Sequence, residues 1–406
     1  MRSFQDQVHR FLTDAVVDRE EVDRFLDPDA PKWARFDGEL GYLPHPSEVQ
    51  DGIDGAISTY RYGEFGERRM INAADRECRI NTYGDSFTQC HQVSDGETWQ
   101  EYLAGHFGEP IRNFGVGGFG VHQAYRRLRR TEATDAGAEY VVFNIFLDDH
   151  YRSLDAYRRL RVGHGWWEMH RAQRTSMFHA NPWVHVRFDG AGQLVERPNS
   201  CPTPESLYLL CDRDFLLDTY DKDLVVQLLV GQRTGDFDFL AQHADTAAAL
   251  GLSLDLSSET GRRRAADQFY DRCAFRASIL LLDRMRSALA EQDKKLLVLL
   301  SYPGDAVADA CAGKPRPDAE FVTLIDDLGI TYVDSLAMHV ADFAAYTTTP
   351  DEYIDRYYIG GGHYSPAGNH WFAFAVKPAF VSWLQPAPPS YTTDVSSPTV
   401  RAEHLA

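Results

Sequence analysis

The feature that most constrains the fold is an almost uninterrupted apolar run at residues 140–147, broken only by Asn144. Such a run predicts a β-strand covered on both faces, as the strands of parallel sheets are. Shorter runs predict further strands at residues 79–83, 111–114, 296–300 and 330–333. Because helical patterns separate these strands, the sequence favours the α/β class, as a three-layer α/β/α sandwich built on a five-stranded parallel sheet.

The alternation of strands and helices stops between the third and fourth predicted strands. Residues 151–262 lie in this interval and include a hairpin pattern around Asp189 and Gly190. We therefore expect residues 75–150 and 263–385 to form one catalytic domain, interrupted by an insertion or lid at residues 151–262. The flanking parts are an N-terminal helical arm and extended segment (residues 1–74) and a C-terminal tail (residues 386–406).

Composition narrows the class of protein. The chain has 406 residues, with 60 acidic and 41 basic side chains and a formal net charge of −19, which repels nucleic acid. No apolar segment approaches the roughly 18 residues of a membrane span, and none resembles a signal peptide. Six scattered cysteines fit reduced thiols. The sequence thus predicts a cytoplasmic enzyme or binding protein with no nucleic-acid partner and no membrane span, and leaves its oligomeric state open.

Polar and glycine residues follow the predicted strands where a catalytic site is expected. In an open parallel sheet, ligands bind at the carboxyl ends of the strands. The segments at these ends are Gly84-Asp85-Ser86, Gly117-Gly118, Asp148-Asp149-His150 and the loop that carries His363. A serine, a histidine and backbone amides at one edge suit nucleophilic acyl transfer, in which histidine accepts the serine proton and amides hold the oxyanion.

At these positions the chain resembles the SGNH/GDSL hydrolase family of esterases and acyl-modifying enzymes. The resemblance spans about residues 75–150 and 290–385 and follows the family's order of motifs. It implies a flavodoxin-like sandwich in which Ser86 is the nucleophile and His363 the general base. It also implies an oxyanion hole made by the amides of Ser86 and Gly118 with the residue at position 148. No cofactor is expected, and the substrate is a small-molecule ester.

Two positions depart from the family's pattern. Asp148 stands where the family usually has an asparagine, and an ionised carboxylate there would repel the developing oxyanion. We expect Asp148 to be protonated, paired with a cation, turned away or used for another task. Before the histidine, Gly360 to Gly362 replace the aspartate that orients the imidazole. A backbone carbonyl or a carboxylate, with Asp334 and Asp355 as candidates, would then orient His363.

Each candidate also has a structural interpretation. Ser86 could cap a helix, Gly118 could serve a positive φ angle, and His363 could be structural. His91 and Cys90 are expected to pack in a helix. A weaker alternative is a metal site, for which the available ligands are Asp85, Asp148, Asp149, His150 and His363.

The insertion is expected to decide the substrate. Its aromatic and histidine side chains either wall a pocket above the serine or form a small core of the insertion. These side chains are Trp166, Trp167, Trp183, Tyr208, His164, His170 and His179. The sequence therefore predicts a serine esterase that hydrolyses a small acyl ester, with acetyl as one candidate, through a Ser86 acyl-enzyme. The alternatives are an acyltransferase on the same fold and a catalytically impaired ligand-binding protein.

Overall fold

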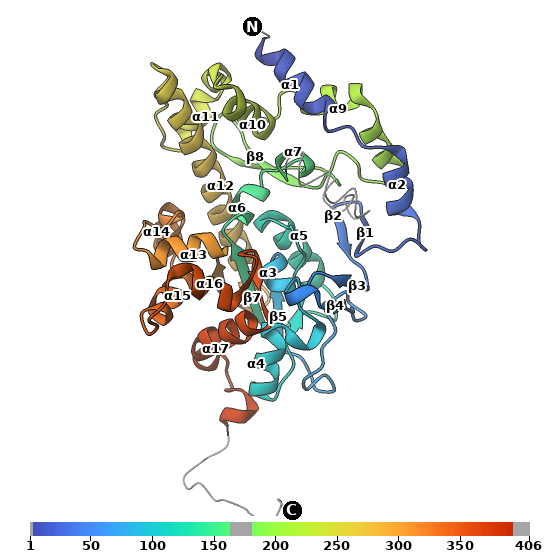
Figure 1. Ribbon diagram of the computed structural model, residues 1–406, viewed down its shortest axis with the longest axis vertical. Helices are drawn as coiled ribbons and strands as arrows, with labels where there is room; N and C mark the ends of the chain where they lie inside the picture. Colours follow the sequence, from blue (N-terminus) through green and yellow to red (C-terminus); the bar gives the residue numbers. More distant parts are fainter. Residues whose placement is uncertain (1–2, 163–180, 393–406) are drawn as a thin grey trace, which may run out of the picture.

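A five-stranded, all-parallel sheet forms the centre of the protein (Figure 1). The computed structural model describes residues 3–162 and 181–392. In chain order the strands of this sheet are β5 (Ile80–Tyr83), β6 (Arg112–Asn113), β7 (Tyr140–Phe146), β10 (Lys295–Ser301) and β11 (Tyr332–Asp334). Each lies where the sequence predicts a strand, so the predicted five-stranded parallel sheet is confirmed.

The strands are arranged in the order β11-β10-β7-β5-β6, with all neighbours parallel. Numbered along the chain, this is 2-1-3-4-5, the order of doubly wound, flavodoxin-like sheets. From β5 the chain moves outward to β6, and it then returns to β7 on the other side of β5. The connections after β5 and β7 therefore leave in opposite directions, which places the expected ligand-binding crevice at the carboxyl ends of these two strands.

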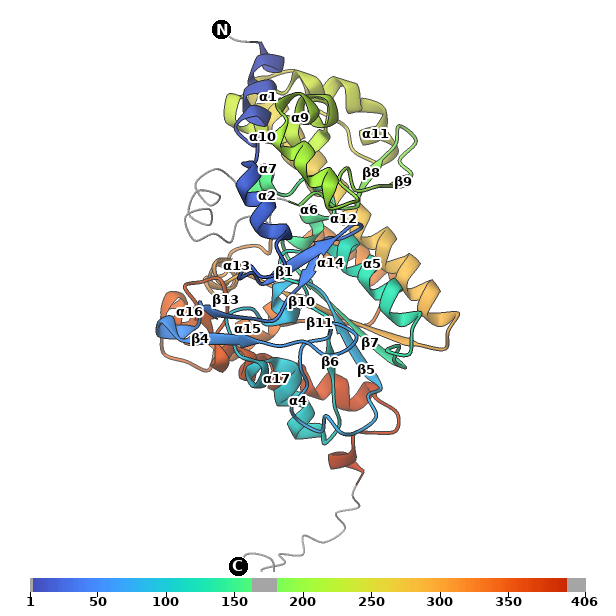
Figure 2. The same cartoon turned by 90° about the vertical axis from the view of Figure 1, so that its right-hand side faces the viewer.

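Helices pack on both faces of the sheet, which is consistent with an α/β/α arrangement (Figure 2). On one side α12 (Glu259–Ala290) contacts α5 (Val121–Glu132), α14 (Ala319–Leu328) and strand β10. On the other side α17 (Pro366–Trp383) contacts α4 (Trp99–Phe107), α15 (Ser335–Phe343) and α16 (Pro350–Tyr357). The remaining elements of this part are α3 (Ser86–Gln89), α13 (Gly304–Cys311), the pair β12 (Tyr358–Ile359) and β13 (His363–Tyr364), and the 3-10 turns η2 (Asp95–Glu97) and η6 (Pro389–Tyr391).

Strand β7 shows why the apolar run is informative. Val141, Val142 and Phe143 are fully buried, as expected for a strand covered by helices on both faces. The one polar residue of the run, Asn144, is also buried, and its side-chain oxygen accepts a hydrogen bond from the Ser301 hydroxyl of β10 at 2.8 Å. This cross-strand bond satisfies the amide oxygen inside the sheet.

Between β7 and β10 the chain forms a smaller group of helices and one hairpin. The hairpin is antiparallel, as the sequence predicts. The elements are α6 (Asp149–Arg152), α7 (Arg159–Val162), β8 (His185–Phe188), β9 (Leu194–Arg197), η4 (Glu205–Cys211), α9 (Arg213–Tyr220), α10 (Leu224–Thr234), η5 (Asp238–His243) and α11 (Ala244–Ala249).

The N-terminal helices belong to this second group. The apolar pattern of residues 4–26 forms two helices, α1 (Phe4–Thr13) and α2 (Arg19–Leu26), and α1 packs against α9 and α10 (Figure 1). Together they share a second hydrophobic cluster in which Trp183 is fully buried beside Tyr42 and Phe119. Tyr208 is partly buried and donates to Asp23. The other aromatic and histidine residues singled out in the insertion, Trp166, Trp167, His164, His170 and His179, lie outside the described residues.

The extended N-terminal segment continues as two antiparallel ribbons. In the first ribbon β1 (Ala34–Asp37) pairs with β2 (Gly41–Pro44), and in the second β3 (Ser47–Gln50) pairs with β4 (Ile57–Tyr60). Arg68, which follows β4 in the chain, is buried. A short turn, η1 (Ile53–Gly55), joins β3 to β4. Arg68 donates to the backbone carbonyls of Gln89 and Cys90 at 2.6 and 2.7 Å. This segment is therefore bonded to the loop that follows α3.

No helix in the described ranges 3–162 and 181–392 combines the length and apolar character needed to cross a membrane. The six cysteines carry free thiols.

The loop after β6 approaches α3 so closely that only glycine fits at position 115. A Cβ atom on Gly115 would lie 2.1 Å from the Gln89 nitrogen and 2.5 Å from the Thr88 carbonyl carbon. Both are backbone atoms, so we predict that Gly115→Ala lowers the free energy of unfolding by about 1–3 kcal/mol in urea denaturation. In the control Gly190→Ala, a Cβ has nothing within 4 Å and stability should be unchanged. Equal stability of the two variants would contradict the close approach.

Candidate active site

Ser86 lies directly after β5, at the start of the short helix α3. The helix is capped by Asp85, whose Oδ1 accepts a hydrogen bond from the Phe87 N–H at 2.8 Å. The capping role that the sequence also allowed for Ser86 therefore belongs to Asp85, and the Ser86 hydroxyl faces other partners. Gly84, at φ 151°, makes the turn possible, since a Cβ there would lie 2.5 Å from the Asn144 carbonyl oxygen.

His363 reaches Ser86 from the other end of the chain. Its Nε2 lies 2.8 Å from the Ser86 Oγ. His363 opens strand β13, and the turn from β12 uses Gly360 and Gly361 at φ 55° and 71°, a left-handed conformation that favours glycine. Gly360 and Gly361 thus form the tight turn that carries the histidine. Ser86 and His363, predicted as nucleophile and base, are brought into hydrogen-bond contact.

Gln92 holds the other side of the imidazole. Its Oε1 lies 2.9 Å from His363 Nδ1, and its Nε2 donates to the Asp51 carbonyl at 2.9 Å. Because the amide nitrogen is committed to that carbonyl, the amide oxygen faces His363 and accepts the Nδ1 proton. The imidazole is then in the tautomer whose Nε2 can accept the Ser86 proton. Of the orienting groups considered from the sequence, Asp334 instead accepts from Arg316 at 2.7 Å.

A second histidine lies beside the first. The His91 and His363 rings are 5.2 Å apart, and His91 Nε2 is 3.2 Å from Asp51 Oδ2. Gln92 has a left-handed backbone, with φ 69°, and Cys90 has φ 57°. Strained conformations of this kind in non-glycine residues persist where the surroundings fix them. His91 thus lies beside the Ser86–His363 pair, after the end of helix α3, while Cys90 is buried.

The electrostatic environment favours a neutral imidazole. Burial, with the nearby His91 and Arg152, holds the pKa of His363 well below its usual range. No carboxylate faces Nδ1, since Gln92 occupies that position. A neutral His363 is the form that can accept a proton from Ser86.

Asp85 is a second acceptor for the serine hydroxyl. Its Oδ2 lies 3.1 Å from the Ser86 Oγ and also accepts from Arg152 Nη1 at 3.1 Å. Burial raises the pKa of Asp85, and the charge of Arg152 opposes this shift. The contact to His363 is the shorter of the two, and Arg152 competes for the Asp85 oxygen, so both features favour donation from Ser86 to the histidine.

Asp148 is paired with cations, one of the outcomes expected from the sequence. Arg152 Nε donates to its Oδ2 at 2.8 Å, and Arg161 donates to both carboxylate oxygens at 2.7 and 2.8 Å. Although burial acts to raise it, these two arginines hold the pKa of Asp148 well below its usual range. The carboxylate is therefore ionised, has no proton to donate, and is bound on its two oxygens by guanidinium groups.

Gly118 lies in the loop after β6 at φ 88°, so its positive φ angle is observed. The Tyr42 hydroxyl donates to the carbonyl of the preceding residue, Gly117, at 2.7 Å and fixes this loop. Neither the Gly118 N–H nor the Ser86 N–H donates to a backbone carbonyl of the described residues. Both amides predicted for the oxyanion hole are thus outside the backbone hydrogen-bond pattern of this part of the chain.

Of the residues of the metal alternative, Asp85, Asp148 and Asp149 all bind the Arg152 guanidinium, whereas His150 has other partners. His150 is buried, its Nδ1 lies 2.8 Å from the Ser278 Oγ, and its ring packs against Phe321. In the part of the chain that the structure describes, no group of three or more histidine, cysteine or acidic side chains is placed to hold a metal ion.

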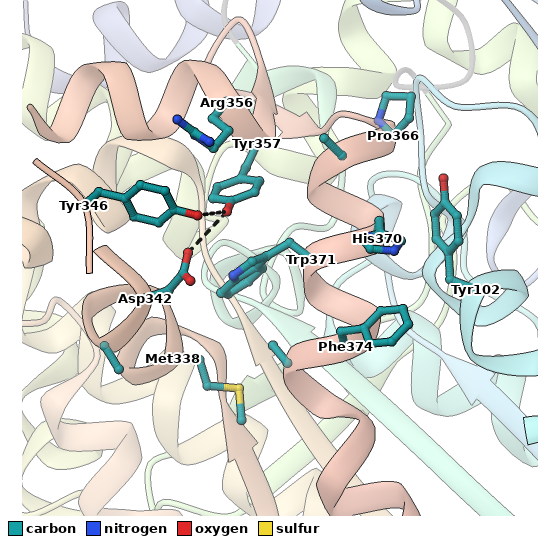
Figure 3. A pocket seen from close by; sticks show the side chains of 13 residues that line it. Tyr102, Met338, Asp342, Tyr346, Arg356, Tyr357, Pro366, His370, Trp371 and Phe374 are labelled. Atoms are coloured by element: carbon teal, nitrogen blue, oxygen red, sulfur yellow. Dashed lines mark hydrogen bonds between the residues drawn. The ribbon is translucent and has the colours of Figure 1, made fainter. Parts of the chain in front are cut away.

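A separate pocket of about 940 Å³ lies along α17 and does not include Ser86 or His363 (Figure 3). Aromatic side chains of α16 and α17 line it, among them Tyr357 and Trp371. Tyr357 donates to Asp342 at 3.3 Å on its wall. The pocket is thus distinct from the Ser86–His363 pair.

Sequence reasoning missed Gln92 and the arginines Arg152, Arg158 and Arg161. For the arginines a signal existed, since Arg152 follows Asp148 by one helical turn and the others follow closely. For Gln92 we find no signal, because its contact with His363 depends on a left-handed backbone and on residues far apart in the chain.

The chain matches no protein-family model, and no curated protein matches it in sequence. The site is therefore interpreted from its own geometry.

The ion pairs of Asp148 generate a stability prediction. Asp148→Asn leaves Arg152 and Arg161 with fewer anionic partners, and we expect the free energy of unfolding to fall by about 1–3 kcal/mol, since the carboxylate side chain is 34% exposed and partly screened. The matched control is Asp214→Asn, whose side chain is 81% exposed and which should change stability by less than about 0.5 kcal/mol. Urea denaturation measures both, and a stability of Asp148→Asn equal to that of the parent would contradict the role of these pairs.

Proposed function

We propose that this chain is a serine esterase of the SGNH/GDSL type that hydrolyses a small acyl ester. The observation that carries the proposal is the 2.8 Å contact between Ser86 Oγ and His363 Nε2, with Nδ1 held by Gln92 at 2.9 Å. A serine whose hydroxyl faces a neutral, oriented imidazole is the arrangement of an activated nucleophile.

The reaction would follow the acyl-enzyme route. Ser86 Oγ attacks the ester carbonyl carbon while His363 Nε2 takes the hydroxyl proton. The amides of Ser86 and Gly118, which donate to no backbone carbonyl of the described residues, would donate to the oxyanion of the tetrahedral intermediate. When this intermediate collapses, His363 returns the proton to the leaving alcohol, and a water activated by the same histidine then releases the acid.

The place of the pair in the fold supports the proposal. Ser86 follows β5, and Asp148 and Asp149 follow β7, the two strands between which the connections diverge. This is the crevice where ligands bind in doubly wound sheets. The site residues also follow the order of the SGNH/GDSL motifs along the chain, which supports the family assignment within the proposal.

The insertion contributes to the surroundings of this crevice. Arg158 and Arg161, which lie in it, approach Gly118 and Asp148 respectively. These contacts support the proposal that residues 151–262 shape the substrate site. The proposal includes a cytoplasmic location and a small acyl group, with acetyl as one candidate. Acyl transfer to another alcohol would use the same intermediate.

Fluorophosphonate labelling tests the nucleophile. The native protein should be labelled at Ser86, because the reagent phosphonylates a serine activated by histidine. Ser86→Ala should abolish labelling and ester hydrolysis, and the control Ser257→Ala, which changes an exposed serine, should leave both unchanged. A native protein that stays unlabelled while a known serine esterase reacts would refute the esterase proposal and favour the ligand-binding alternative.

The pH profile tests the general base. Since His363 must be neutral to accept a proton, and its pKa lies well below its usual range, kcat/KM should fall only at pH values below the ordinary imidazole value of about 6.5. Gln92→Glu places a carboxylate at Nδ1, stabilises the imidazolium and should raise the midpoint of the acid limb by about 1 unit or more.

Gln92→Met is the matched variant for this profile, since it removes the acceptor without adding a charge. It should lower kcat on the order of 10- to 100-fold, because His363 is then no longer held in the tautomer whose Nε2 accepts the Ser86 proton. An acid limb that stays at the same pH in Gln92→Glu would show that position 92 does not govern the base.

A further inference from the structure

Arg158 is a buried guanidinium that lacks hydrogen-bond partners at two of its three nitrogens. The residue is 8% exposed, and in the described part of the chain its Nε and Nη1 have no hydrogen bond of good geometry and no carboxylate partner, the neutral Tyr42 hydroxyl being its polar neighbour. The neighbouring Arg152 and Arg161 are both engaged by aspartates. A buried cationic donor without an acceptor is costly, so its retention indicates an anionic group that binds there during function.

The position of Arg158 beside Gly118 indicates which anionic group this is. A Cβ atom on Gly118 would lie 1.7 Å from Arg158 Nη1 and 2.6 Å from the Tyr42 hydroxyl oxygen, so the guanidinium lies directly against the backbone of Gly118. Gly118 is the residue whose amide the proposed esterase mechanism directs at the oxyanion. The unpartnered Nη1 is thus adjacent to the place where negative charge develops.

Asp148 does not supply a hydrogen-bond donor to the proposed oxyanion hole. The residue at this position was expected to complete the oxyanion hole, but the Asp148 carboxylate is held by Arg152 and Arg161 and has no proton to donate. We propose that Arg158 supplies the missing donor and is a further catalytic residue, an inference that rests on the proposed esterase function.

The step is balanced without any additional reactant. As Ser86 Oγ bonds to the carbonyl carbon, its proton moves to His363 Nε2, and the electron pair of the C=O π bond passes to the oxygen. That oxyanion accepts hydrogen bonds from the Gly118 N–H and from Arg158 Nη1. On collapse the C=O π bond reforms, the alkoxide leaves and the His363 proton passes to it.

A guanidinium donor has two physical advantages here. A hydrogen bond from a cation to an oxyanion is about twice as strong as one from a neutral amide. Burial, with repulsion from Arg152, lowers the pKa of Arg158 to about 10, so the group remains protonated at neutral pH. The Tyr42 hydroxyl, which donates to the Gly117 carbonyl, lies beside the same point of Gly118 and interacts with the Arg158 side chain, so it helps to hold the guanidinium against this loop.

The experiment measures the rate constant for phosphonylation of Ser86 by a fluorophosphonate, because the phosphoryl oxygen takes the place of the oxyanion and no natural substrate is needed. Arg158→Met should slow phosphonylation on the order of 100-fold, the usual effect of removing one such donor. Hydrolysis of 4-nitrophenyl acetate should lose kcat by a similar factor with KM changed less than about 3-fold. A trifluoromethyl ketone inhibitor should lose affinity in parallel with kcat/KM.

Two variants separate catalysis from structure. Arg158→Lys keeps the cation and should recover part of the lost rate, and Arg69→Met, which changes an exposed arginine, should leave all rates unchanged. Thermal unfolding checks that each variant is folded. If Arg158→Met does not fold, the lysine variant decides, since a rate equal to that of the native protein would overturn the proposal.

The remaining outcomes are distinguishable. If Arg158→Met keeps its rates on 4-nitrophenyl acetate and raises KM only for an ester that carries a carboxylate, such as 4-nitrophenyl hemisuccinate, Arg158 binds a substrate anion and the oxyanion proposal fails alone. If Ser86 of the native protein is not labelled at all, the esterase function and this inference fail together. Slower labelling of a folded Arg158→Met protein supports the proposal.

Discussion

The site depends on one buried cation, Arg152, which ties the carboxyl ends of two neighbouring strands together. Its Nη1 bonds to Asp85 after β5 and to Asp149 after β7, and its Nε bonds to Asp148. Although burial acts against its charge, the carboxylates of Asp148 and Asp149 raise the pKa of Arg152 above its usual range. Because Asp85 is also an acceptor for the Ser86 hydroxyl, the Arg152 guanidinium holds the proposed nucleophile at a fixed position relative to the end of β7.

Three acidic side chains, Asp85, Asp148 and Asp149, lie at the crevice, and arginines pair with all of them. Arg152 and Arg161 neutralise Asp148, and Arg152 also pairs with Asp149, which opposes the rise in the pKa of Asp149 that burial and the nearby Asp85 cause. Negative charge next to the serine is thus compensated by cations and burial. Arg158 has no carboxylate partner at Nε or Nη1 in the described part of the chain, and it lies against Gly118. Arg152 and Arg161 thus pair with the aspartates, and the proposed role in catalysis falls to Arg158 of the same segment.

The N-terminal segment has a larger role than a packing arm. Asp51 accepts from the Gln92 amide through its backbone carbonyl and pairs with His91 through its carboxylate. Arg68 donates to the carbonyls of Gln89 and Cys90, and these contacts together hold the left-handed backbone of Cys90 and Gln92. The orientation of His363 thus depends on contacts between the N-terminal ribbons, the loop after α3 and the C-terminal hairpin.

The sequence by itself determined the sheet and the residues at its carboxyl ends. The apolar run of β7 and the alternation with helices are local patterns, and a chain that must bury such a strand on both faces has few solutions. Ser86, Gly118, Asp148 and His363 could be found because they follow predicted strands. The partners of these residues, Gln92 for His363 and Arg152 with Arg161 for Asp148, were decided only by the tertiary structure. Hydrogen bonds and ion pairs are short-ranged, and which side chains come within their reach depends on the packing of segments far apart in the chain.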